Sequence, residues 1–104
     1  MINVCIKREK SHISHISISG HALFAEHGKD IVCAGVSSII IGGINAIHEL
    51  GYIELIEYDV KEGEIDVKIK DCFKYELQVI LETLCIQLKT IEESYSNYII
   101  IQEV

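Results

Sequence analysis

Two residues that could do covalent chemistry lie close together in the sequence, the histidine His21 and the cysteine Cys33. Asp30 precedes the cysteine and belongs to the residue types that most often cap a helix, because its side-chain oxygen accepts from backbone N–H groups two or three residues on. If Asp30 is the N-cap, Ile31, Val32 and Cys33 are the first three helical residues. We therefore predict that Cys33 lies in the first turn of a helix.

A thiol in the first turn of a helix is surrounded by backbone N–H groups without helical partners, at the positive end of the helix dipole. These groups favour the thiolate, so we expect a lowered pKa for Cys33 and a better nucleophile at neutral pH. His21 is the candidate base, and the same amides could stabilise an oxyanion. Residues 22–29, with Gly28, are expected to form a reversing loop that could order around substrate. A buried structural cysteine near an unrelated histidine is the alternative.

Three further residues are candidates for shaping this site. Asp30 either caps the helix only or also orients His21 as a third catalytic member, and we favour capping because a capping carboxylate is already occupied. Its negative charge also raises the thiol pKa somewhat, against the effect of the dipole. Ser37, one turn after Cys33, either touches the site or belongs to its helix alone. Gly20 is expected to bend the backbone at His21.

The segments GHA at 20–22 and DIVCAGVS at 30–37 resemble the signature of the Prp family, the ribosomal-processing cysteine proteases. The resemblance covers almost the whole chain in length and element order. It implies that His21 and Cys33 form the catalytic pair of an endopeptidase. It also implies the substrate, an N-terminal extension of large-subunit ribosomal protein twenty-seven. Gly35 departs from the alanine that is usual in the family, which lowers helix propensity without touching the proposed chemistry.

Length and charge limit the function further. The 104 residues suit one domain, covering 1–104. A formal net charge of −7 argues against nucleic-acid binding, which rests on Lys and Arg that neutralise phosphates. An acidic surface favours a basic partner, such as the N-terminal segment of a ribosomal protein. The same charge fits a competing hypothesis, a dimeric adaptor that binds a basic ribosomal protein and cuts nothing.

The cysteines and histidines indicate neither a disulfide framework nor a metal site. The four cysteines show no C-x-x-C spacing, and the first ten residues do not look like a signal peptide. We therefore expect a cytoplasmic protein with reduced thiols. The missing C-x-x-C partner also disfavours a thiol redox function. His12, His15, His21 and Cys5 lack the spacing of known zinc motifs, so we expect no metal and no cofactor.

The hydrophobic pattern predicts an α+β domain of two layers. Alternating residues predict strands at 2–7, 12–20, 52–59, 64–69 and 97–102, and helical spacing predicts helices at 31–50 and 75–93. The resulting order β-β-α-β-β-α-β suits an antiparallel sheet covered by two helices, with the last strand at an edge. Residues 61–63 are expected to form a turn. In a regular second strand, His21 would share the polar face with His15, Ser17 and Ser19.

The first helix is apolar on nearly every side. Its apolar residues include Val36, Ile39, Ile40, Ile41, Ile44 and Ile47. They cannot all face one sheet at 3.6 residues per turn, so we predict a homodimer in which a second subunit covers this helix. Gly42 and Gly43 would let the backbones approach there. A membrane span is the alternative, but the uncharged stretch 31–48 is barely long enough and contains Asn45, so we predict a buried helix.

Overall fold

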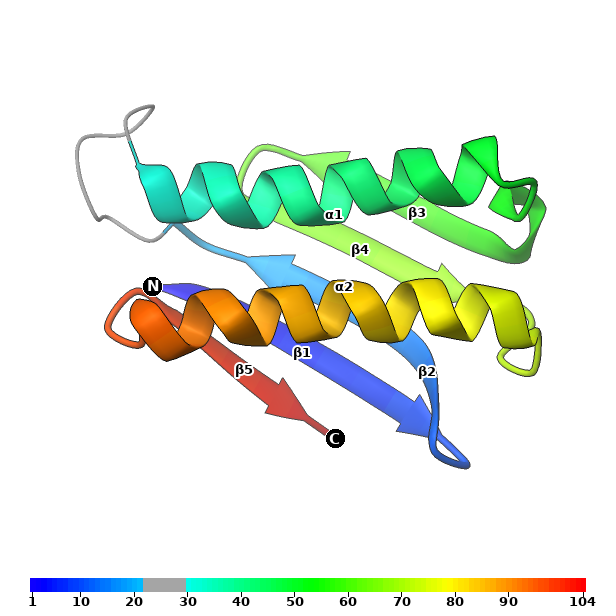
Figure 1. The fold of residues 1–104 in the computed structure, drawn as a ribbon. Coiled ribbons are helices and arrows are strands. Elements are labelled where there is room, and N and C mark those ends of the chain that lie inside the picture. The colour runs from blue at the N-terminus through cyan, green and yellow to red at the C-terminus, as the bar shows by residue number, and fades with distance from the viewer. Residues whose placement is uncertain (22–29) are drawn as a thin grey trace.

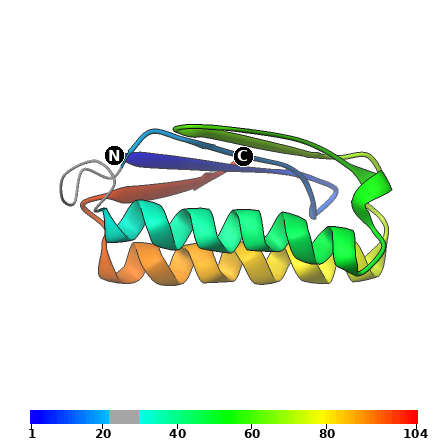
Figure 2. The same cartoon turned by 90° about the horizontal axis from the view of Figure 1, so that it is seen from above.

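The computed structural model describes residues 1–21 and 30–104, which form a five-stranded sheet with both helices on one face (Figure 1, Figure 2). The elements follow the predicted order: β1 (Ile2–Glu9), β2 (His12–Ser19), α1 (Ile31–Glu49), the 3₁₀ turn η1 (Ile53–Leu55), β3 (Ile56–Lys61), β4 (Glu64–Ile69), α2 (Tyr75–Ser94) and β5 (Ile99–Glu103). The two-layer α+β fold predicted from the sequence is therefore confirmed.

The strand order is β3-β4-β2-β1-β5. The first four strands in this order pair antiparallel, as predicted, whereas β5 lies parallel to β1 at the edge. The physical reason is the connection between β4 and β5. The helix α2 carries the chain back to the end of the sheet at which β4 began. β5 therefore runs in the same direction as β4, which is also the direction of β1. The sheet is mixed rather than wholly antiparallel.

The core fills the space between the sheet and the helices. Fully buried side chains come from every layer and include Ile2, Ile6, Ile13, Ile16, Ile40, Ile47, Leu77, Leu81, Leu88 and Ile99. Burying one such aliphatic side chain contributes about 1.5–3 kcal/mol. The helix α1 is long and apolar enough to cross a membrane, but the core helix of a soluble protein meets the same two criteria. The buried hydrophobic residues of α1 belong to this core.

The third strand starts later than predicted. Gly51 has φ +92 and follows the last residues of α1 in the left-handed conformation expected of a helix-ending glycine. The backbone N–H of Tyr52 then donates to the carbonyl of Ile47 at 2.8 Å, and that of Leu55 donates to the carbonyl of Tyr52 at 3.0 Å. These donors are committed to turns, so residues 53–55 form η1 and β3 begins at Ile56.

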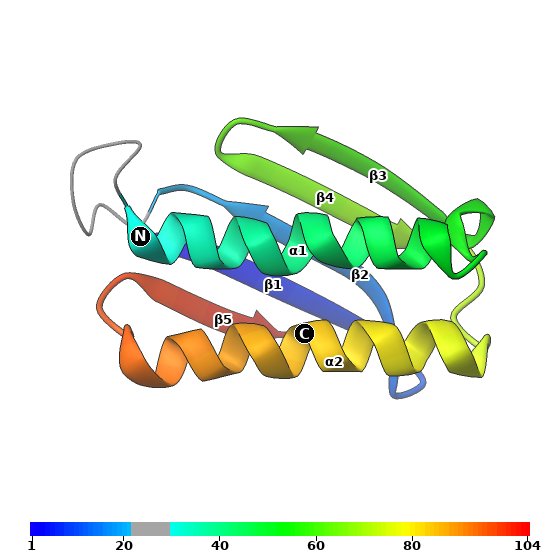
Figure 3. The ribbon, with the colours of Figure 1, turned by 45° about the horizontal axis from the view of Figure 1, so that its top comes forward.

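The helices pack side by side, and the β3–β4 hairpin extends beyond α1 (Figure 3). A Cβ atom on Gly43 would overlap the side chain of Leu84 in α2. The expectation that Gly43 serves a subunit contact is therefore wrong, because this glycine permits the close approach of two helices within one chain. Gly42 faces open space, and Ile31 and Ile41 of α1 are exposed. A homodimer through α1 stays a prediction.

Candidate active site

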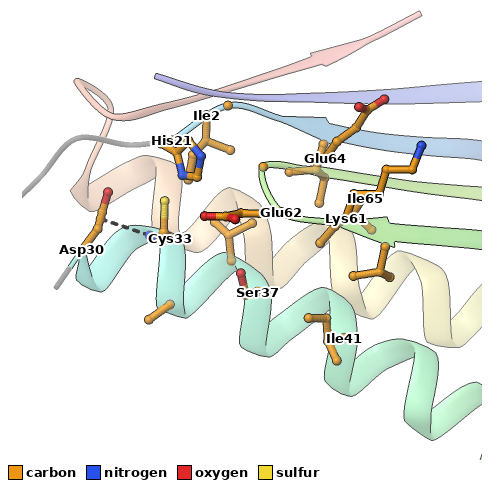
Figure 4. A pocket seen from close by; sticks show the side chains of 16 residues that line it. Ile2, His21, Asp30, Cys33, Ser37, Ile41, Lys61, Glu62, Glu64 and Ile65 are labelled. Carbon is orange, nitrogen blue, oxygen red and sulfur yellow. Dashed lines mark hydrogen bonds between the residues drawn. The ribbon is translucent and has the colours of Figure 1, made fainter. Parts of the chain in front are cut away.

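His21 lies just beyond β2, and Gly20 decides which side of the sheet it occupies. Gly20 has φ +93, and a Cβ atom there would overlap the carbonyl oxygen of Met1. This bend ends the regular alternation of β2, so His21 turns towards α1 and lines a cleft with Cys33 (Figure 4). The prediction that His21 shares the open face of the sheet with Ser17 is therefore wrong.

Cys33 lies in the first turn of α1, because Asp30 caps this helix. The Asp30 carboxylate oxygen Oδ1 accepts from the backbone N–H of Val32 at 2.9 Å and from that of Cys33 at 3.1 Å. Asp30 is itself only 7% exposed. The Cys33 side chain is partly buried, packs against the edge of the core and lines the cleft, where Figure 4 shows its sulfur pointing towards the His21 ring.

The cap has a consequence for the predicted oxyanion site. The N–H groups of Val32 and Cys33 donate to the Asp30 carboxylate, and that of Ala34 donates to the Asp30 carbonyl at 3.1 Å. Each N–H group makes one strong hydrogen bond, so these amides are already used. These three amides are therefore engaged in this structure, and an oxyanion site at the start of α1 stays a prediction. The helix dipole acts on the thiol in either case.

The cleft has a volume of about 500 Å³ and lies between the start of α1, the end of β2 and the β3–β4 turn (Figure 4). It is lined by Ile2, Ile18, Gly20, His21, Asp30, Cys33, Ala34, Val36, Ser37, Ile41, Val60, Lys61, Glu62, Gly63, Glu64 and Ile65. The structure thus brings together every site residue predicted from the sequence except Gly28, which lies outside the described residues. Ser37 stands one helical turn along α1 from Cys33, on the same wall.

The β3–β4 turn is the part of the site that sequence reasoning missed. Gly63 has φ +75, and a Cβ atom there would lie 3.1 Å from Nε2 of His21, so the imidazole packs directly on this glycine. The N–H of Gly20 donates to the carbonyl of Gly63 at 2.9 Å. Glu62 points into the cleft towards Cys33 and His21 (Figure 4). No sequence signal links this turn to His21, because the contact depends on the pairing of β2 with β4.

The other thiols have environments unlike that of Cys33. All four cysteines are free. Burial raises the pKa of the Cys72 thiol and raises that of Cys85 to about 11, because the thiolate is poorly solvated there. Cys5 lies on β1 opposite Ser17 of β2. Among the described residues that line the cleft, Cys33 alone carries sulfur.

A thiol at a helix N-terminus, with an imidazole in the same cleft, is the arrangement of an enzyme that transfers acyl groups through a cysteine. In the described ranges 1–21 and 30–104, no three His, Cys, Asp or Glu side chains are grouped so that they could hold a metal ion. The shared cleft of Cys33 and His21 indicates the class of thiol-dependent hydrolases.

Comparison with known proteins narrows this class. The family model described as cysteine protease Prp matches residues 1–100. A ribosomal processing cysteine protease Prp from Staphylococcus aureus (strain Mu50 / ATCC 700699) is 38% identical over 101 residues, covering 95% of each chain. Two crystal structures of an essential ribosomal processing protease Prp from S. aureus are also similar. One contains a covalently linked product peptide and has a TM-score of 0.90, and the other contains a substrate peptide and has a TM-score of 0.88.

Both structures are 33% identical to this sequence and cover 100% of both chains. The chain therefore belongs to the Prp family of ribosomal processing cysteine proteases, and it is a cysteine protease, as the resemblance in its sequence implied.

Proposed function

We propose that this protease removes the N-terminal extension of large-subunit ribosomal protein twenty-seven, with Cys33 as nucleophile and His21 as general acid and base. The observation that carries the proposal is that the two side chains line one cleft, although one follows a strand and the other begins a helix. The covalently linked product peptide in the S. aureus relative supports a covalent mechanism of this kind.

The residues would act in two steps. His21 accepts the thiol proton, and the Cys33 sulfur attacks the carbonyl carbon of the scissile peptide bond. When the tetrahedral intermediate collapses, the C–N bond breaks and His21 donates the proton to the leaving amine. Water, deprotonated by His21, then attacks the thioester, which releases the new carboxylate and regenerates the thiol.

The start of α1 prepares the nucleophile for this reaction. The dipole of a helix of this length favours a negative charge in the first turn, where the Cys33 sulfur lies. Asp30 sets the register of that turn and contributes an opposing negative charge. We assign to Gly20 the placement of His21 and to Ser37 a place on the cleft wall.

The proposed substrate is the basic N-terminal segment of a ribosomal protein in the cytoplasm, where thiols stay reduced. The net charge of −7 supports a basic partner. We also propose a homodimer through α1, supported by the exposure of Ile31 and Ile41 on that helix.

Mass spectrometry of the purified protein mixed with the extended ribosomal protein tests the proposal. We expect one truncated product with the native protein, and none with Cys33→Ala or His21→Ala. Cys5→Ala, which removes a thiol on β1, should cleave at the native rate. Cleavage by Cys33→Ala would overturn the assignment. A stable complex without cleavage, formed equally by the native protein and Cys33→Ala, would indicate the adaptor.

Iodoacetamide distinguishes the catalytic thiol from the other three. We expect Cys33 to be alkylated well below pH 8, because the helix start favours its thiolate. Cys72 and Cys85 should react only at higher pH, because burial raises the pKa of both thiols. Peptide mapping of the alkylated protein across pH gives each rate. If Cys33 reacts no faster than the other thiols, the start of α1 does not activate it.

A further inference from the structure

Met1 lies beside the candidate catalytic histidine, at the end of the sheet where α1 begins (Figure 1, Figure 2). The α-ammonium nitrogen of Met1 donates to the backbone carbonyl of His21 at 2.5 Å. We propose that Met1 is a positioning residue for His21, and that this hydrogen bond fixes the backbone from which the imidazole projects. This inference rests on the proposed function, because Met1 acts through the candidate general acid and base.

Met1 is itself held by the strand that follows it. Ile2 is 2% exposed, and its N–H donates to the carbonyl of Tyr98 at 2.8 Å. In the sheet, Ile2 also pairs with Ile99 of β5. Because β1 lies between β5 and β2, it has a partner on both edges. The donor on Met1 is therefore presented from one of the best-supported strands of the fold.

The backbone before His21 is also in contact with Met1. A Cβ atom on Gly20 would overlap the Met1 carbonyl oxygen, so the Met1 peptide group packs directly on the Gly20 backbone. On the other side, the Gly20 N–H donates to the carbonyl of Gly63 at 2.9 Å, and the His21 ring packs on Gly63. Residues 20 and 21 are therefore held between Met1 and the β3–β4 turn.

The two supports hold different parts of His21. The β3–β4 turn contacts the imidazole ring, whereas Met1 holds the peptide group at the carbonyl end of the residue. Gly20 allows a wide range of backbone angles, so a residue that follows it can pivot unless its far side is held. A displacement of about 1 Å in a catalytic group can lower the rate about 100-fold. The hydrogen bond from Met1 removes this freedom before substrate arrives.

Met1 acts on the histidine and not on the substrate. Among the described residues, Ile2 and His21 line the cleft, and Met1 does not. Loss of the Met1 donor should therefore lower kcat, because proton transfer by His21 is impaired, and leave KM unchanged. The hydrogen bond is open to solvent, so we expect a loss of about three- to tenfold, the value of one ordinary hydrogen bond.

Semisynthesis removes this donor without any other change in the chain. Cys5 allows a synthetic thioester of residues 1–4 to be ligated to the fragment that begins at Cys5. In one product, desamino-Met1, hydrogen replaces the α-amino group and the side chain is kept. In the matched control, Met1→Leu, the side chain changes and the amino group is kept. The native sequence prepared in the same way is the reference.

The probe for activity is the N-terminal peptide of the extended ribosomal protein. We expect desamino-Met1 to lose about three- to tenfold in kcat at the reference KM, and Met1→Leu to match the reference. Arg8→Met controls for a general loss of stability, because it loosens the opposite end of β1 and should keep the native kcat. If desamino-Met1 keeps the native kcat, or if Arg8→Met lowers kcat by the same factor, the inference is overturned.

Nuclear magnetic resonance provides a readout that does not need cleavage. The nuclear Overhauser effect between the His21 ring and the α-protons of Gly63 reports their contact. It should weaken in desamino-Met1 and stay native in Met1→Leu. If the native protein cuts nothing, the proposed function fails, while this comparison still decides whether Met1 places His21. An unchanged effect in desamino-Met1 would show that the ring keeps its position without the Met1 donor, which also overturns the inference.

Discussion

His21 packs on Gly63, where the lack of a side chain on the glycine leaves room for the imidazole ring. A Cβ atom at this position would lie 3.1 Å from Nε2 and 3.6 Å from Cε1 of the ring. Gly63 also has φ +75, which favours glycine in any surroundings. Two separate constraints, one of backbone conformation and one of space beside the ring, therefore meet at one residue.

Gly63→Ala separates these two constraints when it is compared with Gly51→Ala. Gly51 has φ +92 and nothing within 4 Å of its Cβ position, so alanine there adds backbone strain alone. Both variants should lose about 1–2 kcal/mol of the free energy of unfolding. Only Gly63→Ala should also lower kcat, because its methyl group displaces the ring, and its pH–rate profile should shift while that of Gly51→Ala stays native. Equal activity of the two variants would contradict the packing role of Gly63.

At the scale of elements, the first turn of α1 carries the candidate nucleophile, and its second half packs against α2. Its first turn carries Cys33, and Gly43 in its second half lets α2 approach so closely that Leu84 fills the place of a side chain. The capping carboxylate of Asp30 sets where the helix begins and which side chain of the first turn faces the cleft. Asp30 is thus a positioning residue for Cys33, acting through the helix start.

Asp30→Ala and Asp30→Asn decide whether this cap also has an electrostatic role towards His21. Loss of an N-cap costs about 1 kcal/mol, so Asp30→Ala should lower the free energy of unfolding by that amount. Asparagine keeps an accepting oxygen, so Asp30→Asn should retain stability and cleavage, and its Cys33 should be alkylated at lower pH because a negative charge is gone. If Asp30→Asn loses as much activity as Asp30→Ala, the carboxylate orients His21 as well.

At the scale of the whole molecule, one arginine ties the N-terminal strand to the last helix and the last strand. The Arg8 guanidinium donates to the two carboxylate oxygens of Glu82 in α2 at 2.8 and 2.9 Å, and to Glu103 of β5 at 3.1 Å. These hydrogen bonds hold the pKa of both carboxyl groups below the ordinary 4.5. The network connects segments that are among the most distant in the sequence.

Arg8→Met should remove a contribution to stability that depends on pH. Because the folded pKa values of Glu82 and Glu103 are lowered, the contribution is present above about pH 4.5 and is lost as pH falls through those lowered values. Both carboxylates are partly exposed, so the difference from native at pH 7 should be about 1 kcal/mol. Urea unfolding at pH 7 and pH 3 measures it. A difference that does not shrink at pH 3 would show that Arg8 stabilises the fold through its aliphatic stem.

Local patterns in the sequence by themselves determined the element order, the two-layer class, and the start of a helix just before Cys33. These features depend on residues a few positions apart, such as the Asp30 cap and the apolar stripe of α2. The family signature at 20–37 added the identity of the protease. The strand β3 starts later than the alternation of residues predicted, because the backbone N–H groups of Tyr52 and Leu55 donate within the turns that follow α1.

Only the tertiary structure decided how the site is assembled. In the folded chain, His21 turns towards α1 at Gly20, and its ring packs on Gly63 of the β3–β4 turn. The backbone N–H groups of Val32 and Cys33 donate to the Asp30 carboxylate. The tertiary structure also sets β5 parallel to β1. Each of these depends on which strands pair or which groups compete for a hydrogen bond, and the periodicity of a single segment carries no information about its neighbours in space. For the same reason, the sequence shows Glu62 only as a residue of a turn, whereas the fold places it in the cleft that Cys33 lines.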